Sequence, residues 1–150
     1  MRSILVSGCL YGWNARYDGQ PRPCLHPLFL KWKTQGRLIP VCPEVYGGLS
    51  VPRPPAQRRG DRIVTQAGAD VTEAYEKGAR WALRLAKERQ VVCAILKQGS
   101  PSCGSAEIYD GSFTGRKISG MGLAAEYLQQ AGVPVFDETQ IVLAARLLDD

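Results

Sequence analysis

The run Val91-Val92-Cys93-Ala94-Ile95-Leu96 decides the fold class, because these six consecutive apolar residues form the clearest strand of the sequence. A strand with one solvated face alternates apolar and polar residues, whereas a parallel strand covered on both faces is apolar throughout. We therefore predict a buried strand in a parallel sheet, with helices on both sides of it.

Further strands and helices alternate around this run. The predicted strands cover residues 3–7, 38–42 and 133–136, and Pro40 favours an edge position for the second of them. The predicted helices begin at Pro27, at Asp70 or Thr72, at Met121 and after Asp137, which is expected to cap a last helix carrying Ile141, Leu143, Ala144 and Leu147. This alternation predicts an α/β fold, a single-domain three-layer sandwich with a mostly parallel sheet over residues 1–150.

The composition is that of an ordinary globular protein. Of the 150 residues, 45% are hydrophobic and 22% charged, and one domain of this length can bury its own core. The apolar run near the N-terminus is too short for a signal peptide, and no stretch reaches the roughly 20 apolar residues of a membrane span. We expect a cytoplasmic protein without a membrane partner, whose five cysteines are thiols or metal ligands rather than disulfides.

Much of the net charge of +5 lies in the stretch from Arg53 to Arg62. Clustered arginines attract phosphates, but a proline-rich basic run is more often a solvated surface loop. No aromatic residue lies in this stretch, so it is not a platform for stacking single-stranded bases. We expect a surface loop and no stable nucleic-acid partner.

Three cysteines follow three of the predicted strands. Cys9 comes after the first strand, Cys42 ends the second, and Cys103 lies in the loop after strand 91–96. The carboxyl ends of parallel strands lie at one edge of a sheet, where ligands bind. We therefore predict that these three side chains converge, whereas Cys93 is a core residue within its strand and Cys24 lies in a turn.

Three kinds of chemistry are open to such a group of thiols. A nucleophilic cysteine needs a base, and His26, the one histidine, is at a predicted helix start where capping explains it equally well. A structural zinc site normally closes with four ligands, often in closely spaced pairs that are missing here. An iron–sulfur cluster takes thiolate ligands, and nearby glycines such as Gly48 allow close backbone approach to a bulky inorganic core.

The segments around the cysteines resemble those of a bacterial family, the thiouracil desulfurases. The segments that carry the resemblance are Ser7-Gly8-Cys9-Leu10, Pro40-Val41-Cys42-Pro43-Glu44-Val45-Tyr46-Gly47-Gly48 and Gly99-Ser100-Pro101-Ser102-Cys103-Gly104. The similarity continues through Asp70-Val71-Thr72 and Ile108-Tyr109-Asp110-Gly111, so it covers nearly the whole chain.

This resemblance implies a cofactor, a reaction and a set of residues. Cys9, Cys42 and Cys103 are expected to hold a 4Fe-4S cluster with one iron open to substrate, and Glu44 and Ser100 to assist catalysis. The implied reaction is the non-redox replacement of sulfur by oxygen in a thiolated pyrimidine. The residues expected to bind that substrate are Tyr17, Asp18, Gly48 and Ser102. The alternative is a non-catalytic iron–sulfur or metal-binding sensor, which needs only the three cysteines.

One segment departs from the family pattern. Gln57 stands where related sequences tend to have glutamate, and Arg58 and Arg59 follow it. Additional arginines would favour a phosphorylated nucleotide over a free base as the substrate.

Overall fold

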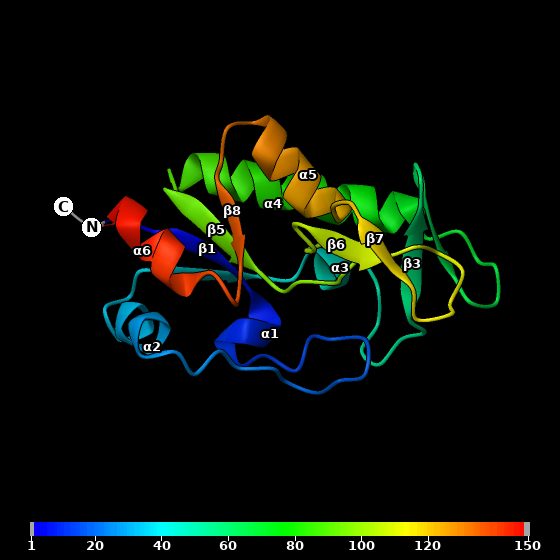
Figure 1. The fold of residues 1–150 in the computed structure, drawn as a ribbon, viewed down its shortest axis with the longest axis horizontal. Helices are drawn as coiled ribbons and strands as arrows, with labels where there is room; N and C mark the ends of the chain where they lie inside the picture. Colours follow the sequence, from blue (N-terminus) through cyan, green and yellow to red (C-terminus); the bar gives the residue numbers. More distant parts are fainter. Residues whose placement is uncertain (1, 149–150) are drawn as a thin grey trace.

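The computed structural model describes residues 2–148 and contains a four-stranded parallel sheet with helices on both faces (Figure 1). The strand order is β2-β1-β5-β8, formed by β1 (Ile4–Ser7), β2 (Leu38–Val41), β5 (Cys93–Leu96) and β8 (Val135–Asp137). Strand β5 lies inside the sheet and all its residues are buried, as its continuous apolar character predicted. Strand β2 lies at the edge, which accommodates the missing N–H of Pro40.

Alternate residues of the central strands face two separate cores. Ile4 and Val6 pack with helices α2 (Pro27–Thr34) and α6 (Ile141–Leu148) on one face. Leu5 packs with α4 (Thr72–Glu88) and α5 (Leu123–Gln130) on the other. The predicted three-layer α/β sandwich is thereby confirmed. Within residues 2–148 no helix is both long and apolar enough to cross a membrane.

The last helix begins later than the sequence indicates. Asp137 ends β8, and its carboxylate accepts the Thr139 N–H at 2.7 Å instead of capping the helix. Helix α6 then starts at Ile141 after a short turn. The helix carries Ile141, Leu143, Ala144 and Leu147 as predicted. Its buried residues are Ile141, Ala144 and Leu148, whereas Leu143 and Leu147 are exposed.

Two antiparallel hairpins lie beyond the same end of the sheet (Figure 1). They are formed by β3 (Ala56–Arg59) with β4 (Arg62–Thr65), and by β6 (Glu107–Tyr109) with β7 (Lys117–Ser119). The first replaces the predicted solvated loop. Arg58 donates to the Met121 carbonyl at 2.7 Å, and Arg53 is buried. Part of the positive charge of this basic stretch therefore contacts the protein instead of solvent.

Two short helices start at the carboxyl ends of strands: α1 (Gly8–Tyr11) after β1, and α3 (Pro43–Tyr46) after β2. Helix α3 lies directly against α4 because two glycines allow it. A Cβ atom at Gly78 would lie 1.9 Å from the Pro43 carbonyl oxygen, and one at Gly47 would lie 2.0 Å from the Ala74 carbonyl oxygen. This contact between backbones fixes the position of Pro43 and hence of its two neighbours, Cys42 and Glu44.

A Gly78→Ala substitution tests this contact. Alanine in place of glycine within an exposed helix would raise stability by up to about 1 kcal/mol. Here the added methyl group must displace backbone, and such overpacking costs about 1–3 kcal/mol. We expect the melting temperature to fall by several degrees, measured by circular dichroism. Lys77→Ala, at an exposed neighbouring position of α4, should change it little; stabilisation by Gly78→Ala would contradict the proposed packing.

Candidate active site

A cavity of about 410 Å³ lies at the carboxyl edge of the sheet. Its walls come from the β1–α1 and β2–α3 junctions, the loop after β5, strand β3 and the β6–β7 hairpin. Cys9, Cys42 and Cys103 all line it, as the positions of their strands predicted. The polar residues that share the cavity include Arg16, Tyr17, Glu44, Arg53, Gln57, Tyr75, Lys97, Ser100, Tyr109 and Lys117.

The three cavity cysteines are free thiols; Cys9 and Cys103 are buried, and Cys42 is half-buried. Burial raises the pKa of Cys9 to about 11, with a further contribution from the neighbouring Cys42. Burial also raises the pKa of Cys42 and of Cys103, while the Ser7 hydroxyl beside Cys103 opposes the rise there. Ligation to metal deprotonates such thiols, because the bound cation supplies the charge that stabilises the thiolate.

The three candidate metal ligands of the cavity, Cys9, Cys42 and Cys103, all offer sulfur. Among residues 2–148, no three His, Cys, Asp or Glu side chains are grouped as they would be around a single metal ion. Three thiols distributed over the wall of one cavity instead suit a larger inorganic core, and thiolates are the ligands of iron–sulfur clusters. The residues present therefore fit such a cluster better than a lone zinc ion.

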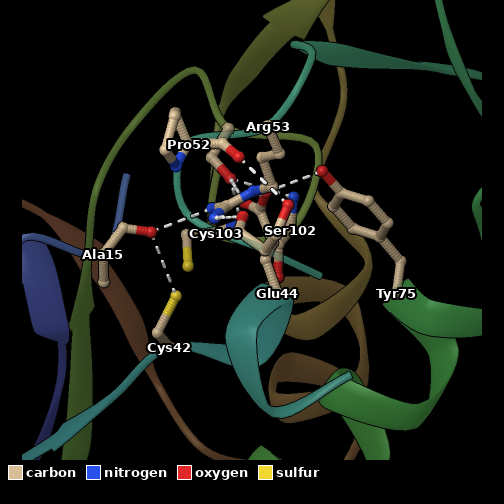
Figure 2. A network of polar contacts seen from close by, with 10 residues as sticks. Ala15, Cys42, Glu44, Pro52, Arg53, Tyr75, Ser102 and Cys103 are labelled. Atoms are coloured by element: carbon tan, nitrogen blue, oxygen red, sulfur yellow. Dashed lines mark hydrogen bonds and ion pairs between the residues drawn. The ribbon is translucent and has the colours of Figure 1, made fainter. Parts of the chain in front are cut away.

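One carboxylate oxygen of Glu44 is held by two other side chains (Figure 2). Its Oε1 atom accepts the Tyr75 hydroxyl at 2.7 Å and the Arg53 Nε–H at 3.1 Å. A second nitrogen of Arg53 lies 3.1 Å from the same oxygen, and the Arg53 side chain is only 5% exposed. Burial, followed by the nearby Glu44 charge, raises the pKa of Tyr75, so its phenol remains a neutral donor. One carboxylate oxygen is thus fully engaged by the protein.

Arg53 also joins Glu44 to the cysteine region. It donates to the Ala15 carbonyl oxygen at 2.9 Å, and the same oxygen accepts the Cys42 thiol at 3.6 Å (Figure 2). Neither Arg53 nor Tyr75 was assigned to the site from the sequence. Arg53 is part of a basic run, and Tyr75 has the spacing of a core residue on a helix, so neither carries a local signal of its role.

Ser100 contacts the other oxygen of Glu44, donating to Oε2 at 3.3 Å. Its Oγ also accepts the backbone N–H groups of Ser102 and Cys103, both at 3.0 Å. The serine therefore shapes the loop that carries Cys103 and at the same time orients Glu44. The structure thus brings together the two residues expected to be catalytic and the three expected to bind metal.

Of the four residues expected to bind substrate, one lines the cavity and three do not. Tyr17 lines the cavity, whereas Asp18, Gly48 and Ser102 are not part of its wall. Asp18 accepts the Gln20 N–H and pairs with Arg16, as in a turn, while Gly48 follows α3 in the left-handed conformation. These three positions therefore give no support to a substrate contact.

Ser102, in the same loop as Ser100 and Cys103, is fully buried. Its carbonyl oxygen accepts N–H groups from the first turn of α5, at Ala124 and Ala125. Its hydroxyl has no hydrogen-bond partner among residues 2–148. Between the two serines, Ser100 is the one that reaches both the cavity and Glu44.

The remaining cysteines and the histidine lie away from the cavity. Cys93 is buried in β5, as predicted. Cys24 is half-buried outside the cavity wall. His26 caps α2, its Nδ1 accepting the Leu28 N–H at 3.1 Å. This arrangement gives none of the cavity cysteines a histidine base.

Arg58 and Arg59, which follow Gln57 in the segment that differs from the family pattern, do not line the cavity either. Arg58 contacts Met121 and Glu126, and Arg59 donates to the Gly111 carbonyl at 2.7 Å. These contacts give no support to the expectation that the two arginines favour a phosphorylated substrate. Their guanidinium groups join the hairpins and α5 instead.

Comparison with known proteins gives the family. The model of the 2-thiouracil desulfurase family matches residues 4–140. The chain belongs to the 2-thiouracil desulfurase family. Uncharacterized protein YbbK of Bacillus subtilis (strain 168) is 42% identical over 148 positions, which cover 92% of this desulfurase and 97% of that protein.

A solved structure also resembles this desulfurase closely. It is that of the [4Fe-4S]-dependent thiouracil desulfidase TudS, with 42% identity, a TM-score of 0.97 and coverage of 99% of this chain and 98% of the other. The resemblance inferred from the cysteine segments is confirmed, and the protein is an enzyme of the thiouracil desulfurase type.

Proposed function

We propose that this desulfurase hydrolyses the thiocarbonyl group of a thiolated pyrimidine, using a [4Fe-4S] cluster held by Cys9, Cys42 and Cys103. Residues 1–150 would act as one desulfurase domain. The observation that carries the proposal is the convergence of three thiols and a carboxylate held by Arg53 on one cavity. The dependence of TudS on such a cluster supports the choice of cofactor.

The proposed reaction exchanges one atom without net oxidation or reduction. Water contributes oxygen to the ring carbon, the C=S bond breaks, and the sulfur leaves as sulfide while a C=O group remains. When bound, a cluster with one iron free of protein thiolate would act as a Lewis acid toward the soft thiocarbonyl sulfur. The remaining tasks, which are positioning the substrate and moving protons, fall to the side chains of the cavity.

Glu44 is the base in this proposal. Its Oε1 is occupied by Tyr75 and Arg53, so proton transfer falls to Oε2, the oxygen that faces Ser100. A carboxylate fixed in this way can take a proton from the attacking water and later return it to the departing sulfur. Ser100 orients Oε2, and Tyr17, which lines the cavity, would contact the pyrimidine ring.

The substrate is a small molecule in this proposal, as a free base, a nucleoside or a nucleotide. A cavity of about 410 Å³ has a size typical of small-molecule sites. The alternative of a non-catalytic sensor leaves the Glu44–Arg53–Tyr75 contacts without a purpose, because a sensor needs only the cluster ligands.

Purification without oxygen, followed by incubation with 4-thiouracil, tests the proposal. We expect a coloured protein with iron and acid-labile sulfide, loss of the thiocarbonyl absorbance, and one sulfide released for each uracil formed. Removal of iron by a chelator should stop the reaction, and reconstitution should restore it. A protein that binds only zinc would contradict the cluster, while an intact cluster without sulfide release would favour the sensor.

A further inference from the structure

Ser7 is a buried cavity residue to which the proposed reaction assigns no task. It is the last residue of β1, is only 3% exposed, and lies directly before the short helix α1. A serine in this position ordinarily accepts an N–H group from the first turn of the helix that follows it. The Ser7 side chain makes no such cap, so its hydroxyl is available for another contact.

The direction of strand β1 places this hydroxyl beside Cys103. Residues two apart in a strand point to the same face, and Ser7 keeps an extended backbone, so its side chain lies on the same face as that of Leu5. Leu5 and Cys103 pack in the same core cluster on that face of the sheet. The Ser7 hydroxyl is hydrogen-bonded to the Cys103 side chain there.

The neighbouring strand determines which atom of this pair donates. The backbone N–H of Lys97, the residue directly after β5, donates to Ser7 Oγ at 2.9 Å. Within residues 2–148 this is the only other hydrogen bond of the Ser7 side chain. A cysteine that binds metal is a thiolate, which can only accept, so the Ser7 O–H must then be the donor. The Lys97 N–H also holds this donor in place from the other side.

We propose that Ser7 is a positioning residue for the cluster, whose hydroxyl donates a hydrogen bond to the Cys103 sulfur, orients this ligand and draws charge from it. The inference rests on the proposed function, which supplies the cluster and its ligands. Groups behind a metal ligand commonly fix its orientation in this way. Hydrogen bonds to ligand sulfurs also help to set the reduction potential of a cluster, and they raise it because they stabilise the more negative, reduced state.

Replacing Ser7 by alanine and by threonine tests the contact, because alanine removes the hydroxyl and threonine keeps it. The reduction potential of the cluster would be measured in anaerobically purified protein by a potentiometric titration followed by electron paramagnetic resonance. We expect Ser7→Ala to have a more negative potential than the native protein, and Ser7→Thr to restore most of the difference. Release of iron to a chelator should be about tenfold faster in Ser7→Ala, since a support of one ligand is lost.

Loss of a buried hydroxyl also destabilises the protein, so a matched control is needed. Ser7→Ala leaves the Lys97 N–H without its acceptor. Thr65→Val does the same to the Ala69 N–H, which Thr65 accepts at 3.1 Å in a buried position of β4 outside the cavity wall. Both variants should have a lower melting temperature, but only Ser7→Ala should change the potential and the release of iron. An equal change in both variants would overturn the inference, as would a native potential in Ser7→Ala.

These measurements separate the inference from the proposed function, because none of them needs turnover. If the native protein holds a cluster but releases no sulfide, a potential that depends on Ser7 supports the inference, and only the proposed reaction fails. If sulfide is released and the potential does not depend on Ser7, only the inference fails. A folded Ser7→Ala protein without iron, restored by Ser7→Thr, also supports the contact. A native protein that holds no iron overturns both.

Discussion

Replacing Cys9, Cys42 or Cys103 singly by alanine is expected to reduce sulfide release from 4-thiouracil to background. Three thiolates are the smallest set that holds a four-iron cluster with one iron free of protein ligands, so none of the three is dispensable. Iron and acid-labile sulfide per chain, with the visible absorbance of the protein, would be measured after anaerobic purification. We expect all of these signals to fall together in each variant.

Loss of packing must be separated from loss of a ligand. Cys9 and Cys103 are part of the two cores and are 8% and 6% exposed, so shortening them also removes apolar contacts. Cys93→Ala is the matched control, because it shortens a fully buried cysteine in β5, outside the cavity. It should lower the melting temperature somewhat and leave the iron content intact. A Cys42→Ala protein with full iron content would contradict the proposed ligand set.

The sheet and the convergence of the cysteines could be predicted because each follows from a strong local pattern. The continuous apolar character of 91–96 indicates burial on both faces, and parallel strands bring their carboxyl ends to one edge. Pro27 and His26 mark the start of α2 in the sequence itself. Such patterns depend on a few neighbouring residues, so no knowledge of distant contacts is needed.

The hairpins and the contacts that Arg53 and Tyr75 make with Glu44 could not be predicted, because they depend on distant partners and not on a local pattern. Strands β3 and β7 are polar and mostly exposed or half-buried, and they lack the alternation that identifies a strand. Arg53 is buried because Glu44, Ser50 and Ala15 together satisfy its guanidinium group. These partners are distant in sequence or lie in loops, so composition alone indicated a solvated basic stretch.

A Glu44→Gln substitution is expected to lower kcat for 4-thiouracil by about 10²- to 10⁴-fold, the usual contribution of a positioned acid–base group. Glutamine can accept the Tyr75 hydroxyl and the Arg53 Nε–H in place of Oε1, but its amide nitrogen cannot take a proton from water. Initial rates of sulfide release would be measured at equal cluster content. Glu126→Gln, which removes a carboxylate paired with Arg58 outside the cavity, is the control.

The substitution also leaves the buried Arg53 without its counter-charge, and breaking a buried ion pair can cost about 3–5 kcal/mol. Glu44→Asp therefore accompanies it. Aspartate keeps the negative charge beside Arg53 but is one methylene group shorter, so it cannot reach both Tyr75 and the substrate side of the cavity. We expect the melting temperature of Glu44→Asp to be closer to that of the native protein than the melting temperature of Glu44→Gln is. Glu44→Asp should nevertheless lose most of its kcat. If Glu44→Asp recovers stability and rate together, the carboxylate serves only to balance Arg53, and the base must be sought elsewhere in the cavity.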